Sequence, residues 1–459
     1  MHRRAAPSLT VVERRRARRQ AYLNGGLWAV GNGLLSTTLV TYLASELGAE
    51  REGLGVSLIL AARHFVGLLR MAAPAVIGRW ADRKPFCIVS YLLSTMVLMS
   101  LPWLAAPGCL PTPDASLAAL VVIWCLYHVL EYLGTVALWS WLGDLAASRV
   151  RGRFLGRRER WMLVGQIVAT IVAAAFAQSW KQHVPQPLWI AYAITAGVGA
   201  VVMAASLLPL LQMPAAERRA AERPSPTGAT PPRATPPRPA REGLPWRALV
   251  QPFRDGPFLR LLLFNCWFSA CNGLTQTAQN LYPIRVLHIS LALSLAVQTA
   301  MRGGQWAISP GLGRLADRRG NRPMMAVCLL IVALGPLCYC AATAERWQWY
   351  FGAWAAWVAY AGLNVGLPNL LLRLAPRQTD TPYIATYYAI GSACYAAATV
   401  AGGQALDWLR GRVWDVPGLG ACDVYQVSFL LGWAARTAGA ALLWLIVVEP
   451  PVARRPPPG

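Results

Sequence analysis

Four amide side chains share one face of a predicted helix near residue 270. The segment FNCWFSACNGLTQTAQN spaces them by seven, four and three residues, as Asn265, Asn272, Gln276 and Gln279. These steps return to the same side of an α-helix, so the four groups form a row. Neutral hydrogen-bond donors and acceptors of this kind suit a hydroxylated ligand such as a sugar, a polyol or a nucleoside. The alternative is a seam of amides that joins this helix to its neighbours.

A histidine and a glutamate lie three residues apart in another apolar segment. In LYHVLEYLG they are His128 and Glu131, and this spacing places them on one helical face. Burial favours the neutral form of a carboxyl group, and a nearby imidazole can share or relay its proton. The pair is our candidate for proton coupling. The alternative is a neutral Glu131 that is hydrogen-bonded to a neighbouring helix.

Arginines also occur within apolar segments, where an ion is costly and is a candidate for function. Because a guanidinium group stays charged, Arg70 and Arg302 each need a carboxylate, carbonyl groups, a water-filled cavity or a substrate anion. In the internal repeat described below, Arg70 aligns with Gln305 and Arg302 aligns with Gly67. We therefore expect an asymmetric site here. Arg63 lies nearer the outer surface and is expected to extend toward it.

Membrane helices must position these residues, because the chain is strongly apolar. It has 459 residues, of which 56% are hydrophobic and 14% charged, and its mean hydropathy is +0.38. Apolar stretches of about 20 residues, enough to cross a bilayer, recur along the chain. We predict an all-α integral membrane protein with twelve spans. They are residues 21–45, 54–77, 86–106, 117–142, 160–180, 187–211, 258–284, 291–312, 323–343, 347–372, 382–408 and 425–448.

Membrane topology explains the net charge of +23 better than nucleic-acid binding does. With the N-terminus inside, 33 of the 43 Lys and Arg residues fall in predicted cytoplasmic segments and 6 in external loops. This asymmetry is what the positive-inside rule requires. We expect both termini in the cytoplasm, a location in the cytoplasmic (inner) membrane, contacts with membrane lipids and no nucleic-acid partner.

The two halves of the chain repeat each other at an offset of about 235–240 residues. The tripeptide NGL at Asn32 recurs at Asn272, which makes Asn32 a further substrate-binding candidate. A parallel repeat of six spans is typical of two bundles related by an axis along the membrane normal. The expected division is a basic tail 1–20, a six-helix bundle 21–211, a Pro/Arg-rich linker 212–257, a second six-helix bundle 258–449 and a tail 450–459.

A charged phrase occurs once in each half. GRWADRKPF begins at Gly78 and GRLADRRGNRP at Gly313, each at the expected cytoplasmic end of an even-numbered span. Glycine lets two helices approach closely, and an Asp beyond a helix end can cap or attract the positive N-terminus of a neighbouring helix. A basic loop that serves topology alone would not need Gly-Arg-x-Ala-Asp-Arg at the same point of both halves.

These phrases resemble the Gly-x-x-x-Asp-Arg-x-Gly-x-Arg signature of the major facilitator superfamily of secondary transporters. In that family the motif follows the second helix, and a degenerate copy commonly follows the eighth. By position, the resemblance assigns the gating motif to Gly78, Asp82 and Arg83 in the first half, and to Gly313, Asp317, Arg318, Gly320 and Arg322 in the second.

The resemblance implies that the motif latches the two halves together on the cytoplasmic side, with its Asp near the start of the eleventh helix. Here that start reads TDTPY, with Asp380 or Thr381 as a cap. The first copy departs from the pattern, since Pro85 replaces its second glycine and its last arginine is absent. A weaker latch is expected.

The resemblance further implies a monomeric secondary transporter that moves a small-molecule substrate by alternating access. From the residues we expect H+ as the coupling ion, and favour uptake of a hydroxylated solute by a symporter. One alternative is an exporter of drugs or metabolites, and another is a transport-inactive sensor or scaffold. The sequence has no nucleophile–base pair, metal-ligand spacing or phosphate-binding loop, so no enzyme activity, metal or cofactor is expected. Cys109 and Cys422 are expected in external loops, either free or paired.

Overall fold

The computed structural model is almost entirely helical. It describes residues 11–70, 83–104, 106, 108–145, 151–214, 251–375, 380–418 and 420–447. Residues 78–82 of the first copy of the charged phrase, with Gly78 and Asp82, lie outside these residues, as does most of the expected linker.

The first half of the chain forms one group of helices. Its elements are α1 (Val11–Leu34), α2 (Thr37–Glu46), α3 (Glu52–Gly67), η1 (Leu68–Arg70), α5 (Arg83–Met99), α6 (Leu101–Leu104), α7 (Pro113–Leu145), α8 (Arg151–His183), α9 (Leu188–Ala205) and α10 (Leu207–Leu211). The first expected span is therefore two helices. Ser36 interrupts it and caps α2, because its side chain accepts a hydrogen bond from Leu39 N.

The second half forms the other group. Its elements are η2 (Gln251–Arg254), α12 (Gly256–Arg285), α13 (Leu291–Arg319), α14 (Asn321–Ala341), α15 (Trp349–Trp357), α16 (Tyr360–Leu374), α17 (Asp380–Trp408), β1 (Val413–Val416), β2 (Gly420–Asp423) and α18 (Val424–Ile446). Asp255 caps α12, and Asp423 forms a capping box with Gln426 at the start of α18. The expected tenth span is also two helices, α15 and α16.

The twelve expected spans each correspond to one helix or to a pair of consecutive helices. In the described part of the chain, nine segments are long and apolar enough to cross a membrane. The other three spans are α3, α12 and α13. Helices α12 and α13 have 30 and 29 residues, but their amide and cationic side chains lower their hydropathy.

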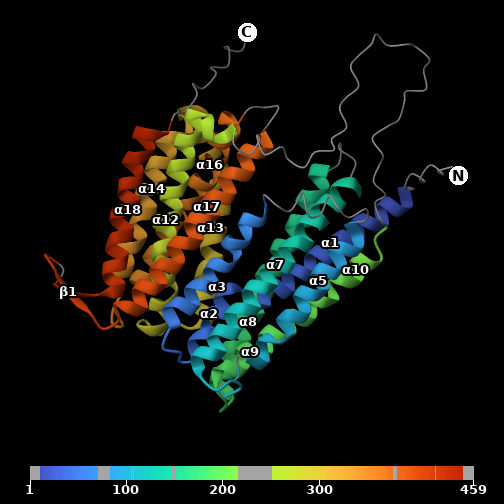
Figure 1. Ribbon diagram of the computed structural model, residues 1–459, viewed down its shortest axis with the longest axis horizontal. Helices are drawn as coiled ribbons and strands as arrows, with labels where there is room; N and C mark the ends of the chain where they lie inside the picture. The colour runs from blue at the N-terminus through green and yellow to red at the C-terminus, as the bar shows by residue number, and fades with distance from the viewer. Residues whose placement is uncertain are drawn as a thin grey trace, which may run out of the picture.

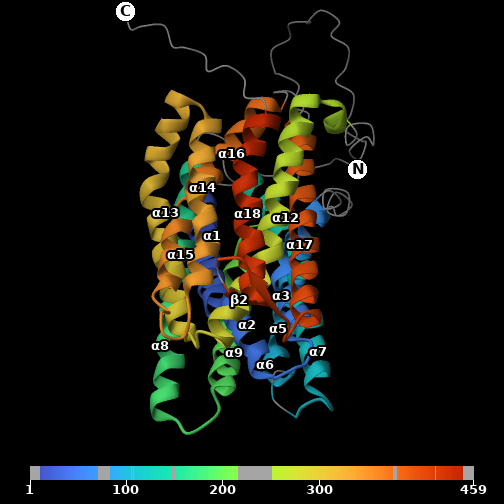
Figure 2. The same ribbon diagram turned by 90° about the vertical axis from the view of Figure 1, so that its left-hand side faces the viewer.

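The two groups of helices approach each other at one end of the molecule and separate toward the other (Figure 1). Within the second half, the long helices run roughly parallel to one another (Figure 2). We call the end where α1 begins and α18 ends the terminal face. The opposite end, with the α2–α3, α12–α13 and α17–α18 connections, is the far face. Helix α3 packs against α17, and α8 packs against α13, so these four helices form most of the contact between the halves, and α2 and α12 add to it.

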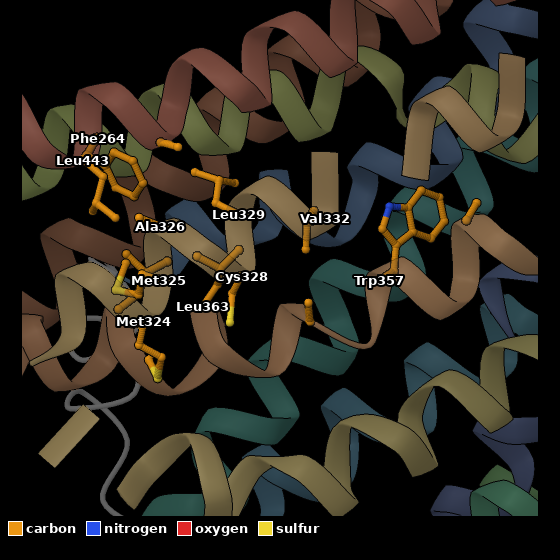
Figure 3. Close-up of a cluster of buried hydrophobic side chains, with 14 of the residues drawn as sticks. Phe264, Met324, Met325, Ala326, Cys328, Leu329, Val332, Trp357, Leu363 and Leu443 are labelled. Atoms are coloured by element: carbon orange, nitrogen blue, oxygen red, sulfur yellow. The ribbon is translucent and has the colours of Figure 1, made fainter. Parts of the chain in front are cut away.

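Buried apolar side chains hold each half together. The core of the second half lies among α12, α14, α16 and α18, with Phe264, Leu329 and Leu363 as central members (Figure 3). In the first half, Leu39 and Leu43 belong to a cluster that also takes in Leu291 of the second half. The apolar core is thus continuous between the halves near the far face.

One feature of the far face was not expected from the sequence. Between α17 and α18 the chain forms an antiparallel hairpin, in which β1 pairs with β2 and Val413 lies opposite Asp423. All ten cysteines are described and all are free thiols, with Cys109 exposed and Cys422 buried in the hairpin. The pairing considered for these two cysteines is not made in this structure.

Candidate functional site

A cavity of about 800 Å³ lies between the two halves. The first half contributes residues of α1, α2, α3 and α8, and the second half contributes residues of α12, α13, α14, α15, α16 and α17. The lining includes amides, hydroxyls and aromatic rings, and among its ionisable groups are Arg63, His64 and Arg302. The substrate candidates Asn32, Asn265, Asn272, Gln276, Gln279 and Arg302 all line this cavity.

The amide row of α12 also serves to join helices. Asn265 donates to Tyr387 O at 3.1 Å, and Gln279 donates to the Thr275 hydroxyl at 3.0 Å. Asn272 accepts from the Tyr360 hydroxyl at 2.6 Å. Asn265 and Asn272 thus line the cavity and also hold α12 against α17 and α16, whereas the hydrogen bond of Gln279 lies within α12.

Gln276 differs from the other members of the row. It lines the cavity, and its side chain has no hydrogen-bond partner among the described residues. Asn32, its counterpart candidate in the first half, donates to the Tyr127 hydroxyl at the long distance of 3.5 Å. These two amides are the ones best able to exchange their present surroundings for a ligand.

Arg436 of α18 has a structural role that the sequence did not reveal. Its side chain is buried, and it donates to Asn272 Oδ1, Thr275 Oγ1 and Gly432 O at 3.2, 2.9 and 3.1 Å. Three neutral acceptors thus satisfy a guanidinium group without any carboxylate. The only signal in the sequence was an arginine inside the last apolar span. Its side-chain partners, Thr275 and Asn272, are 161 and 164 residues away.

Arg63 and Arg302 occupy equivalent places in the two halves. Each lies eleven positions after the first residue of its helix, Glu52 for Arg63 and Leu291 for Arg302. Both line the cavity, so the expectation that Arg63 extends toward the outer surface is wrong. Counted from the helix starts, Arg302 corresponds to Arg63, whereas the repeat offset of the charged phrase places it opposite Gly67. The side chain of Arg70, in η1, lies outside the described residues.

The pair expected to move protons does not line the cavity. His128 is 6% exposed and packs between Trp124 and Tyr127, with ring centroids at 4.7 and 4.8 Å. Its Nε2 atom is buried without a hydrogen-bond partner among the described residues. Glu131 accepts from the Thr135 hydroxyl of its own helix at 2.9 Å. No described hydrogen bond joins His128 to Glu131.

The second copy of the charged phrase ends α13 at the terminal face. Asp317 and Arg318 are exposed, and neither has a described hydrogen-bond or ion-pair partner. Gly320 has φ of +91°, a conformation that favours glycine, and it turns the chain from α13 into α14. Arg322 donates to Trp444 O and places its guanidinium 4.9 Å from the Trp444 ring centroid, within the same half.

One expectation about this motif is not met in the described conformation. A Cβ atom at Gly313 would meet no other atom within 4 Å, so the expected close approach of two helices at this glycine is absent. Of the first copy, only Arg83 is placed, as the first residue of α5, and its side chain is not described. The side chains of Asp380 and Thr381 also lie outside the described set.

Cross-half contacts gather instead at the far face. Arg285 of α12 donates to both carboxylate oxygens of Glu52 at 2.9 and 3.1 Å and to Ser45 O at 2.9 Å. Glu52 is 5% exposed. The Tyr42 hydroxyl donates to Ile289 O at 2.7 Å. These bonds tie the α2–α3 turn to the α12–α13 turn.

Asp407, near the end of α17, caps a helix of the opposite half. Its two carboxylate oxygens accept from Gly53 N at 2.9 Å and Leu54 N at 2.7 Å, the first amides of α3. A carboxylate at a helix N-terminus satisfies unpaired N–H groups and faces the positive end of the helix dipole. Gly403 lets the two backbones meet, because a Cβ atom there would clash with Gly53 O and with the Ser57 side chain.

The described conformation is therefore closed at the far face. Deeper in the molecule, the His64 and Tyr395 rings still connect the halves, with centroids 4.0 Å apart. Beyond this contact the halves separate toward the terminal face (Figure 1). Two groups of helices therefore surround a central polar cavity, which is closed at the far face.

Comparisons with known proteins agree with this geometry. A mutant of the nucleoside transporter NupG has a TM-score of 0.67 at 13% identity, over 94% of this chain and 99% of that chain. A D-xylose–proton symporter has a TM-score of 0.65 at 13% identity, over 95% and 98% of the two chains. An inward-open form of the xylose transporter XylE from E. coli has a TM-score of 0.61 at 13% identity, over 94% and 96%.

These identities are too low to transfer a substrate, so the structural likeness establishes the fold alone. No curated protein sequence matches the chain significantly. The family model described as Major Facilitator Superfamily, however, matches residues 21–305, which is more than half of the chain. The chain thus belongs to the major facilitator superfamily, and it is a multi-pass membrane transporter rather than an enzyme.

Proposed function

We propose that this protein is a monomeric secondary transporter that moves a small hydroxylated solute by alternating access, with H+ as the coupling ion. The observation that carries the proposal is the polar cavity between the halves, covered at one face by contacts that join them. Alternation requires two such closed faces, of which one is formed at a time. The gating motif in each half would supply the second closure, at the terminal face.

The terminal face is the cytoplasmic face in this proposal. Its support is the distribution of cations, with 33 of the 43 Lys and Arg residues in segments on the side of the termini. The described conformation is then inward-facing, and the protein resides in the cytoplasmic (inner) membrane. An antibody-accessible tag at either terminus should be reached only after the membrane is permeabilised.

A hydroxylated solute fits the chemistry of the lining. Gln276 and Asn32 offer amide groups, and Tyr388 and Trp354 offer aromatic faces that can stack on a ring. Structures of a nucleoside transporter and of a D-xylose–proton symporter share the fold, and their substrates are of this kind. We regard this likeness as support for the class of solute and for uptake.

Glu131 is the candidate for the coupling proton. Of the carboxyl groups that the structure describes, it is the one placed in the middle of a membrane helix, since the others lie at helix ends or in connections. Its single described hydrogen bond is to Thr135, and it lies within electrostatic range of Arg63, which lines the cavity. A proton on Glu131 therefore changes the charge that acts on a cavity residue.

The proposal is tested by flux into proteoliposomes that contain the purified protein. Uptake of D-xylose, uridine and their charged relatives is compared with and without an imposed pH gradient. Transport of one solute class, accelerated by an inward proton gradient, would support proton-coupled uptake. A transport rate that does not change with the pH gradient would exclude proton coupling. A complete lack of flux for every solute would exclude the transport function.

The first prediction concerns the Glu131→Gln variant, which cannot release a proton. Proton-driven uptake should fall to the background of empty liposomes, whereas counterflow exchange of the solute should persist, because exchange needs no net proton movement. Glu345→Gln, in an exposed connection, is the matched control and should behave as wild type. Proton-driven uptake at the wild-type rate by the Glu131→Gln variant would remove this residue from the mechanism.

A further inference from the structure

We propose that the substrate carries an anionic group, a carboxylate or a phosphate, which Arg63 and Arg302 bind from opposite halves of the transporter. This inference rests on the proposed function and names the chemistry of its substrate more closely. The substrate class becomes a hydroxylated organic anion instead of a neutral sugar or nucleoside.

The formal charge of the cavity lining is the first observation. Arg63 and Arg302 are lining residues, and no Asp, Glu or Lys is among the lining residues of the described chain. Both arginine side chains are exposed. Since a guanidinium group stays protonated at any physiological pH, the cavity is positively charged.

The second observation is that these two guanidinium groups are not paired. Neither has a hydrogen bond or an ion pair with any described residue, and Arg302 is close enough to Arg63 to be repelled by it. Glu131 attracts Arg63 from a distance but forms no ion pair with it. Two like charges that line one cavity within membrane helices are costly, so a ligand that neutralises them is stabilised.

Other arginines of the chain show what a satisfied guanidinium group is like in this fold. Arg436 donates to three acceptors, and Arg285 donates two hydrogen bonds to the Glu52 carboxylate. Both side chains serve structure, and both are occupied in the absence of any ligand. Arg63 and Arg302 lack such partners, which distinguishes a binding group from a structural one.

The positions of the two arginines form the third observation. Arg63 lies eleven residues after the start of α3 and Arg302 eleven residues after the start of α13, so they reach the cavity from opposite halves. An anionic group at the centre of the cavity can be approached from both sides at once. Carboxylate and phosphate oxygens accept two parallel hydrogen bonds from one guanidinium group, and such a group could therefore bridge the halves.

The neighbouring side chains are suited to the rest of such a ligand. Thr299 and Gln298 lie on the same helix as Arg302 and line the cavity, and Gln276 faces it from α12. These groups can donate to and accept from hydroxyls. A lipophilic cation, the substrate expected for the alternative role as a drug exporter, would be repelled by the arginine pair.

The test is a thermal-shift titration of the purified protein in a phosphate-free buffer, with matched pairs of probes. D-Glucuronate and D-glucose differ by a carboxylate, uridine monophosphate and uridine differ by a phosphate, and inorganic phosphate is included alone. The proteins are wild type, Arg63→Gln, Arg302→Gln, the double variant and the control Arg346→Gln, which alters an exposed arginine outside the cavity.

We expect at least one anionic probe to raise the melting temperature of wild type and of Arg346→Gln more than its neutral partner does. Each cavity variant should weaken that binding at least about tenfold, and the double variant should abolish it. The inference is wrong if no anionic probe stabilises wild type more than the double variant, or if neutral and anionic partners bind equally.

A ligand-free measurement gives an independent check. The Arg302→Gln variant removes one of two repelling charges, so without any probe its melting temperature should be higher than that of wild type. An unchanged or lower melting temperature would contradict the inference that the two arginines repel each other without a neutralising partner. These binding and stability results stand whether or not flux is seen. Transport of a neutral solute that both cavity variants retain would overturn the anion inference while leaving the transport function intact.

Discussion

The far face and the terminal face of this transporter use an aspartate differently. At the far face, Asp407 of one half accepts hydrogen bonds from Gly53 N and Leu54 N of the other half. At the terminal face, Asp317 of the signature motif is exposed and has no described partner. The same chemistry, an aspartate that caps an opposing helix, was expected from the sequence at the terminal face and is observed at the opposite one.

This difference indicates how the two conformations are balanced. A transporter must be able to exchange one closed face for the other, so the contacts of each closure need to be similar in free energy. A factor of ten in the ratio of two conformations corresponds to about 1.4 kcal/mol. Removing one strong contact from the far face should therefore shift the population toward the conformation that is closed at the terminal face.

The largest shift is expected from Asp407→Ala. Its carboxylate, of which 13% is exposed, accepts two backbone hydrogen bonds, and their loss should cost the inward-facing conformation about 3 kcal/mol. Labelling of a cysteine at Ser269, a lining residue, by an impermeant maleimide from the far face should rise strongly in a background without native cysteines. Asp415→Ala on the exposed hairpin is the control. Equal labelling of the Asp407→Ala and Asp415→Ala proteins would show that Asp407 does not hold the far face closed.

A smaller shift is expected from Arg285→Gln, which removes the ion pair with Glu52. The Arg285 side chain is 41% exposed, so solvent screens the pair and the effect should be about 1 kcal/mol. The same maleimide assay should show a modest rise in far-face labelling. In 1 M salt the difference from wild type should shrink, whereas a difference that is independent of salt would point to packing rather than charge.

The smallest effect on the described conformation is expected from Asp317→Asn. Because Asp317 has no described partner here, the thermal stability of ligand-free protein should change by less than about 0.5 kcal/mol in free energy. The closure at the terminal face should weaken, and labelling of the Ser269→Cys reporter from that face should increase in inverted vesicles. If the Asp317→Asn variant is labelled from the terminal face only as much as wild type, Asp317 does not contribute to the closure of that face.

Much of the fold was predictable from local properties of the chain. Apolar stretches of bilayer length, the bias of cations to one side and the repeated Gly-Arg-x-Ala-Asp-Arg phrase are all contained in the amino-acid order. The breaks at Ser36 and between α15 and α16, and the hairpin before α18, were not foreseen. These features depend on caps and pairings that add little to hydropathy over a window of twenty residues.

The candidate site was predictable in part. The amide row of α12 was visible from its spacing, yet its bonds to Tyr360, Tyr387 and Arg436 depend on neighbours more than 80 residues away. The correspondence of Arg63 and Arg302 was hidden, because the repeat offset of the charged phrase places Arg302 opposite Gly67.

By itself, the sequence determined the membrane environment, the duplication and the superfamily, because each depends on local composition or on a short contiguous motif. The tertiary structure alone decided which face is closed, which amides are already occupied and which arginines have no partner among the described residues. These properties depend on helices from both halves, and the partner of a charged group is set by packing that no local pattern records.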